Sequence, residues 1–119
     1  MDFNKLYEDI MRIDPKIRFV SILDFDGRLI RGGQREGISN YLSPDAEKKS
    51  IRHAMESWQL RSQFSNSIGE GKYAIVEYEK IKRITIPLDK NHLIYMTTEV
   101  DADHAKIIDK ILQLKSEGK

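Results

Sequence analysis

The chain of 119 residues contains no cysteine, and this absence excludes several kinds of chemistry. There can be no disulfide bond, no thiolate metal site and no cysteine nucleophile. Small secreted domains often depend on disulfides, so the lack of cysteine mildly favours an intracellular location.

Long apolar runs are also missing. No segment approaches the ~20 apolar residues that a membrane-spanning helix needs. The first fifteen residues are charged and lack the apolar centre of a signal peptide. We therefore expect a cytoplasmic protein without a membrane span.

The sequence has no excess of charge of either sign. Lysine and arginine number 20, and aspartate and glutamate number 19. This balance provides no basic field of the kind that attracts nucleic acid, and we expect no nucleic-acid partner.

Three segments have the pattern of helices. Residues 2–13 place apolar side chains on one face, with Asp2 as a candidate N-cap. A second helix opens at Ser43, which can cap it, and is predicted to continue to about Ile68. Residues 103–116 form the third, with Ala105, Ile108, Ile111, Leu112 and Lys115 along one face.

Five segments have the pattern of strands. They are residues 17–25, 28–33, 72–79, 82–88 and 92–100. Asp26-Gly27 predicts a tight turn between the first two. The first and last runs are apolar on both faces, which is typical of central strands.

The element order is therefore α-β-β-α-β-β-β-α. Turns of only a few residues join the last three strands, which requires antiparallel pairing. Placing the two fully apolar strands side by side gives an α+β fold with a five-stranded antiparallel sheet of order 2-1-5-4-3. The terminal helices then cover one face and the middle helix the other. We expect a single domain over residues 1–119, with the second and third strands at the edges.

The first hairpin, F-V-S-I-L-D-F-D-G-R-L-I from Phe19 to Ile30, and this element order resemble the roadblock family within the profilin-like folds. The family includes dynein light chains and bacterial gliding regulators, and we expect this chain to be a small archaeal member. The resemblance implies a non-enzymatic module that forms homodimers or heterodimers through its third strand, with the second helices alongside. It also implies a platform for small GTPases or larger assemblies.

Transferred to this chain, the resemblance predicts a dimer interface. The strand part would come from residues 72–79 and the helix part from the second helix; the predicted interface residues are Ile51, Met55, Trp58, Arg61, Tyr73, Ile75 and Glu77. The residues give some independent support, because an edge strand without proline needs protection or a partner. The alternative is that Trp58 belongs to the core and that Phe64 folds back onto the following loop.

The same hairpin contains the strongest enzyme-like motif. An apolar strand that ends in D-x-D-G resembles the nucleophile loop of haloacid-dehalogenase phosphatases, with Asp24 as nucleophile and Asp26 as acid/base. Arg28 stands where that family has threonine or valine, and a hairpin follows where a parallel sheet would be needed. We therefore interpret the motif as a turn in which Asp24 bonds backbone N–H groups.

Other candidate sites are weaker. The oxygen ligands of a calcium loop do not follow D-x-D-G, and His53, His92 and His104 have no metal-binding spacing. Gly69-x-Gly71 precedes a strand, whereas phosphate-binding glycines precede a helix. Two basic clusters, on the second helix and at residues 80–83, are interspersed with acids and favour a solvated surface. We expect no metal and no cofactor.

The leading hypothesis is a non-enzymatic, homodimeric interaction module that regulates or scaffolds a partner such as a small GTPase. The alternative is a PAS-like small-molecule sensor, because those domains also have five-stranded antiparallel sheets. That alternative requires a cavity of several hundred Å³ between sheet and helices.

Overall fold

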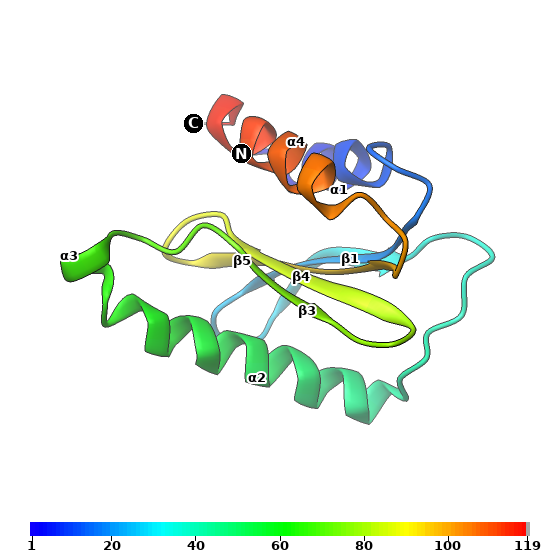
Figure 1. Cartoon of the computed structure of the whole chain (residues 1–119), viewed down its shortest axis with the longest axis horizontal. Helices are drawn as coiled ribbons and strands as arrows, with labels where there is room; N and C mark the ends of the chain where they lie inside the picture. Colours follow the sequence, from blue (N-terminus) through cyan, green and yellow to red (C-terminus); the bar gives the residue numbers. More distant parts are fainter. Residues whose placement is uncertain (119) are drawn as a thin grey trace.

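A five-stranded antiparallel sheet lies at the centre of the computed structural model, which describes residues 1–118 (Figure 1). The elements along the chain are α1 (Phe3–Met11), β1 (Ile17–Asp24), β2 (Leu29–Gln34), α2 (Pro44–Ser62), α3 (Ser65–Ile68), β3 (Ala74–Glu77), β4 (Ile81–Pro87), β5 (His92–Glu99) and α4 (His104–Glu117). The strand order is β2-β1-β5-β4-β3, so the predicted fold class and topology are confirmed.

Helices cover both faces of the sheet. Figure 1 shows α1 and α4 on one face and the long α2 across the other. The side chains accordingly form two cores. The larger core joins the sheet to α1 and α4 and contains Val20, Ile84, Ile94 and Ile108. The smaller core, beneath α2, contains Phe19, Leu23, Ala54, Met55, Trp58, Leu93 and Tyr95.

The central pair of strands has the predicted burial. In β1 every residue from Ile17 to Leu23 is buried, and β5 is almost as completely covered. The two strands pair from Ile17↔Thr98 to Asp24↔His92. Alternation of side chains between the two cores explains why both faces of each run are apolar.

Two predicted caps occur at helix starts. The Asp2 carboxylate accepts a hydrogen bond from the Lys5 N–H, and the Ser43 hydroxyl accepts one from the Ala46 N–H. Pro44 occupies the first helical position of α2, where its missing N–H costs nothing. Within residues 1–118, none of these helices has the length and apolar character needed to cross a membrane.

The second helix ends earlier than predicted. It stops at Ser62, and the separate short helix α3 follows. The Ser62 hydroxyl donates to the Gln59 carbonyl at 2.6 Å, and the Ser65 hydroxyl donates to the Ser62 carbonyl at 2.9 Å. These side chains compete with the backbone for helical acceptors, which favours an interruption here.

Two further predictions need correction. The third strand is shorter than residues 72–79, because the turn towards β4 already begins at Tyr78, whose N–H bonds the Ile81 carbonyl. The buried face of α4 is centred on Ile107, Ile108 and Ile111, while Ala105 is exposed.

Candidate partner-binding surface

The outer edge of β3 has no neighbouring strand within the described residues. This strand pairs only with β4, from Ala74↔Thr85 to Glu77↔Lys82. Its four residues, A-I-V-E, include no proline or lysine that would prevent further pairing. Backbone N–H and C=O groups along such an edge are available to another strand.

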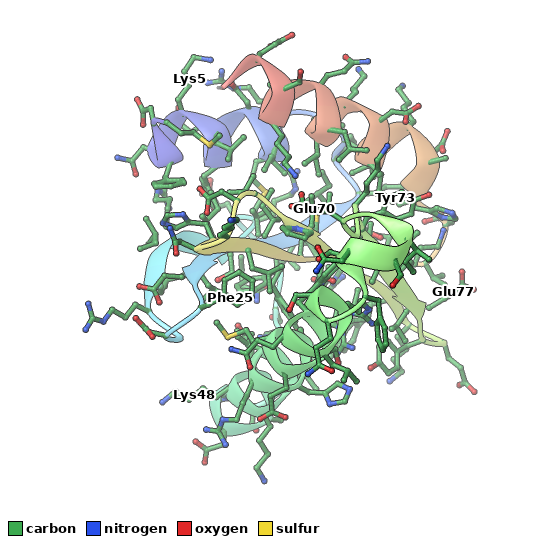
Figure 2. All side chains as sticks on the ribbon, turned by 90° about the vertical axis from the view of Figure 1, so that its left-hand side faces the viewer. Lys5, Phe25, Lys48, Glu70, Tyr73 and Glu77 are labelled. Atoms are coloured by element: carbon green, nitrogen blue, oxygen red, sulfur yellow. The ribbon has the colours of Figure 1, made fainter. Side chains whose placement is uncertain are left out.

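Large apolar side chains are exposed beside this edge. Figure 2, which looks from the α3 end of the molecule, shows Tyr73 and Glu77 along this side and Phe25 and Lys48 on the other. We define the β3-edge surface as the exposed apolar residues from the end of α2 to the end of β3: Leu60, Phe64, Ile68, Tyr73 and Val76. Ile68 is the extreme case, with 84% of its surface accessible. Exposed apolar side chains beside an unpaired strand edge are candidates for contact with a partner.

The seven predicted interface residues divide into two groups. Met55 and Trp58 are buried in the protomer's own smaller core, and Ile51 packs against that core while half-buried. The reason is that residues 51, 55 and 58 follow the helical period and face the sheet below α2. Met55 and Trp58 are thus largely covered within their own protomer, and their contact with a partner stays a prediction. The alternative interpretation of Trp58 as core agrees with its burial.

Three of the four remaining predicted residues are better placed for a partner. Tyr73 and Glu77 are exposed, and Arg61 is exposed with its guanidinium 4.8 Å from the centre of the Trp58 ring. Ile75 is half-buried and points to the opposite core, that of α1 and α4. No contact in the structure tests whether these residues form an interface, so that part stays a prediction.

The surface also contains residues that sequence reasoning did not assign to an interface. Leu60 and Phe64 stood out in the sequence because they lie off the apolar stripe of α2, and both are more than half exposed. Phe64 therefore does not fold back into a covered position. Ile68 and Val76 gave no signal, because an apolar residue in a short strand or helix is ordinarily covered.

The Asp24 carboxylate holds the β1–β2 hairpin. Its Oδ1 accepts hydrogen bonds from the N–H groups of Asp26 at 3.0 Å and Arg28 at 2.9 Å. Gly27 has φ +90°, whereas Asp26 does not have positive φ, so glycine alone supplies the left-handed conformation. Asp24 thus has the turn role that we preferred over a nucleophile.

The three histidines lie apart and have local roles. Nδ1 of His104 lies 2.8 Å from the Lys82 ammonium, and Nδ1 of His92 lies 2.9 Å from the Asp89 carboxylate. His53 is exposed on α2. Among residues 1–118, no three acidic or histidine side chains converge as metal ligands would.

The fold of this protein is similar to that of solved Roadblock/LC7 domains. A Roadblock/LC7 domain from Streptomyces avermitilis matches with a TM-score of 0.73 and 15% identity, covering 98% of this chain and 94% of that one. MglC from Myxococcus xanthus matches with a TM-score of 0.64 and 14% identity, covering 99% of this chain and 96% of that one. The gliding protein MglB from Thermus thermophilus matches with a TM-score of 0.73 and 12% identity, covering 96% of this chain and 82% of that one.

At identities this low, the structural matches establish the shared fold and nothing more. They confirm the roadblock resemblance at the level of architecture. A PAS-like sensor receives no support from these matches. No curated protein matches the sequence. Residues 4–117 match the model of a family of unknown function, DUF6659, and the chain belongs to that family.

Proposed function

We propose that this protein is a non-enzymatic, self-associating interaction module that regulates or scaffolds a partner protein. The observation that carries the proposal is the unpaired edge of β3 together with the exposed apolar residues of the β3-edge surface. Residues 1–119 act as one domain in this proposal.

Association of two copies would join their sheets through β3. An edge-to-edge contact satisfies backbone groups of both strands, and a two-fold arrangement uses the same residues twice. The ends of the neighbouring α2 helices and the residues that follow them would then bring Leu60 and Phe64 of each copy into the contact. One MglB structure is described as having a tetrameric arrangement, which shows that a protein with this fold can form larger assemblies.

A small GTPase is the partner that we propose for the assembled module. The support is the fold and the gliding-protein relatives, so it is an argument from fold analogy. The homodimer itself has a physical basis in the exposed edge, whereas the GTPase and an archaeal source rest on resemblance.

Light scattering coupled to size-exclusion chromatography tests self-association. At about 50 µM, a homodimer with a low-micromolar Kd should have about twice the 13.9 kDa mass of one chain. Phe64→Lys and Val76→Lys place charges on the β3-edge surface and should shift the protein towards monomer. Leu29→Lys is the matched control, because Leu29 is similarly exposed but lies on β2, and it should not change the mass.

A wild-type protein that is monomeric at this concentration would contradict the proposed dimer. Equal disruption by Leu29→Lys would show that general solubility, and not the β3 edge, determines the mass. For the partner, retention of a GTPase from lysate of the source organism should depend on whether GDP or a non-hydrolysable GTP analogue is added.

A further inference from the structure

A second feature lies on the α2 face of the sheet, near the start of that helix. A cavity of about 750 Å³ opens between the first half of α2, the β3–β4 hairpin and the loop that precedes α2. We call it the α2–hairpin cavity. Its volume lies within the usual range for small-molecule sites, and its size exceeds what a single side chain fills.

The floor of the cavity carries a connected set of polar groups from three elements. The Tyr95 hydroxyl on β5 lies 2.7 Å from the Ser50 hydroxyl on α2, and an Nη of Arg83 on β4 donates to the same Ser50 oxygen at 2.9 Å. Tyr95 is only 2% exposed, and burial raises the pKa of its phenol. These groups are therefore positioned by the fold and do not depend on flexible surface side chains.

Arg83 has an unbalanced charge at this position. Its side chain is half-buried, and no carboxylate among residues 1–118 lies within 4.0 Å of its guanidinium. Within residues 1–118, its guanidinium has one hydrogen bond, to the Ser50 hydroxyl, and it also lies near enough to the Tyr95 phenol to affect its pKa, which leaves most of its five N–H donors free. A partly desolvated cation of this kind is stabilised by an anion that accepts its remaining donors.

Counted together with Arg83, the charged residues of the cavity lining leave a small positive excess. Its lining includes four cations, namely Arg18, Lys49, Lys80 and Arg83, and two acids, Glu47 and Glu79. The Arg18 guanidinium is paired with Glu99, while Lys49 and Lys80 have no carboxylate within 4.0 Å among the described residues. Burial raises the pKa of Glu47, whose carboxylate also accepts a hydrogen bond from the Asn40 amide.

Aromatic rings form the upper walls. Tyr41 lies between two cations, with its ring centre 4.6 Å from the Arg18 guanidinium and 5.4 Å from the Lys80 ammonium. The Tyr78 ring centre lies 5.9 Å from the Arg83 guanidinium. Both tyrosines are about half exposed, so part of each side chain is open to a planar group that packs against it.

We propose that the α2–hairpin cavity binds a small anionic molecule that carries a planar ring. The anionic group, a carboxylate or a phosphate, bonds the free N–H donors of Arg83 near Ser50, and Lys80 adds attraction at the rim. The ring stacks on Tyr41 or Tyr78. The site belongs to the protomer and does not require self-association.

Calorimetric titration with matched probe pairs tests this site. Indole-3-acetate and AMP supply the carboxylate and the phosphate, while indole-3-ethanol and adenosine are their neutral counterparts. One of the anionic probes should bind with a Kd of about 1 mM or tighter, and its neutral counterpart about tenfold more weakly. Amide chemical-shift changes should concentrate at residues 50, 78–83 and 95–97.

Arg83→Gln should weaken binding of the anionic probe about tenfold and leave the neutral probe unchanged. Glutamine removes the charge and keeps a polar side chain that can donate hydrogen bonds. Lys80→Gln removes an exposed rim charge that the fold does not need. It should weaken binding of the anionic probe by a smaller factor than Arg83→Gln does. Arg28→Gln is the control, because Arg28 is exposed at the β1–β2 turn and outside the cavity lining.

Three results would overturn the proposal. They are no saturable binding of either anionic probe, equal affinity for charged and neutral members of both pairs, or shift changes outside the cavity. Light scattering on the same samples reports the mass, so loss of ligand binding and loss of self-association are observed separately.

Discussion

The indole N–H of Trp58 donates a 2.8 Å hydrogen bond to the Thr85 hydroxyl, and both side chains are buried. This bond joins the second half of α2 to β4 across the smaller core. It explains why a tryptophan can be enclosed here, since its one polar atom has a partner. The second half of α2 therefore has its own polar link to the sheet, in addition to those that Ser50 makes in the first half.

We expect Trp58→Phe to lower the free energy of unfolding by about 1–3 kcal/mol, because it removes the bond and leaves the Thr85 hydroxyl buried without this donor. Thr85→Val should also destabilise the protein, since the indole N–H loses its acceptor. The double variant should lower the free energy of unfolding by less than the sum of the losses in the two single variants. Urea unfolding of all four proteins measures the coupling, and simple additivity would show that the bond contributes nothing.

Gly71 determines how closely the chain passes Trp58. A β-carbon at this position would lie 2.6 Å from Cζ3 of the indole. Gly71→Ala should therefore displace the ring or the chain and cost about 1–3 kcal/mol of unfolding free energy. Tryptophan fluorescence should change as well, since this is the only tryptophan. The neighbouring Lys72→Ala is the control, and equal stability of the two variants would contradict the steric explanation.

The buried phenol of Tyr95 should make stability depend on alkaline pH. Burial raises its pKa, although the Ser50 hydrogen bond and the Arg83 charge act in the opposite direction. The folded-state pKa lies above the unfolded value of about 10, so the folded protein holds the proton more tightly. The stabilisation of the folded state that results from this pKa difference is fully present below pH ~10. It decreases as the pH rises from there through the folded-state pKa.

Comparison of wild type with Tyr95→Phe isolates this contribution, because other titrating groups are common to both. The difference in unfolding free energy should change above pH ~10 and remain constant below it. A difference that does not vary with pH would show that Tyr95 ionises equally in both states.

Arg35 fixes the segment between α1 and β1. Its Nε donates to the Ile17 carbonyl at 2.7 Å, and an Nη donates to the carbonyls of Met11 at 2.6 Å and Asp14 at 2.9 Å. Lysine has one ammonium and cannot reproduce this fork, so Arg35→Lys should cost about 1–3 kcal/mol. Arg28→Lys, at an exposed arginine, should cost little by the same thermal or urea measurement, and equal effects would contradict the argument.

The order of the strands could be predicted because it depends on patterns within single segments. The apolar runs at residues 17–25 and 92–100 identified the two central strands, and Asp26-Gly27 identified the first hairpin. The Ser43-Pro44 start of α2 was likewise readable from local chemistry. Such features follow from turn geometry, capping and periodic burial, which act over a few neighbouring residues.

The residues that form the candidate sites are brought together by contacts between segments far apart in the sequence. The sequence alone showed that Trp58 is apolar and lies on the helical stripe, but Thr85 and Gly71, far along the chain, place it in the core. The sequence also predicted β3 as an edge strand. The exposure of Val76 and Ile68, however, depends on what the rest of the chain leaves uncovered. Ser50, Arg83 and Tyr95 meet only because α2 crosses β4 and β5, and no spacing in the sequence records that crossing.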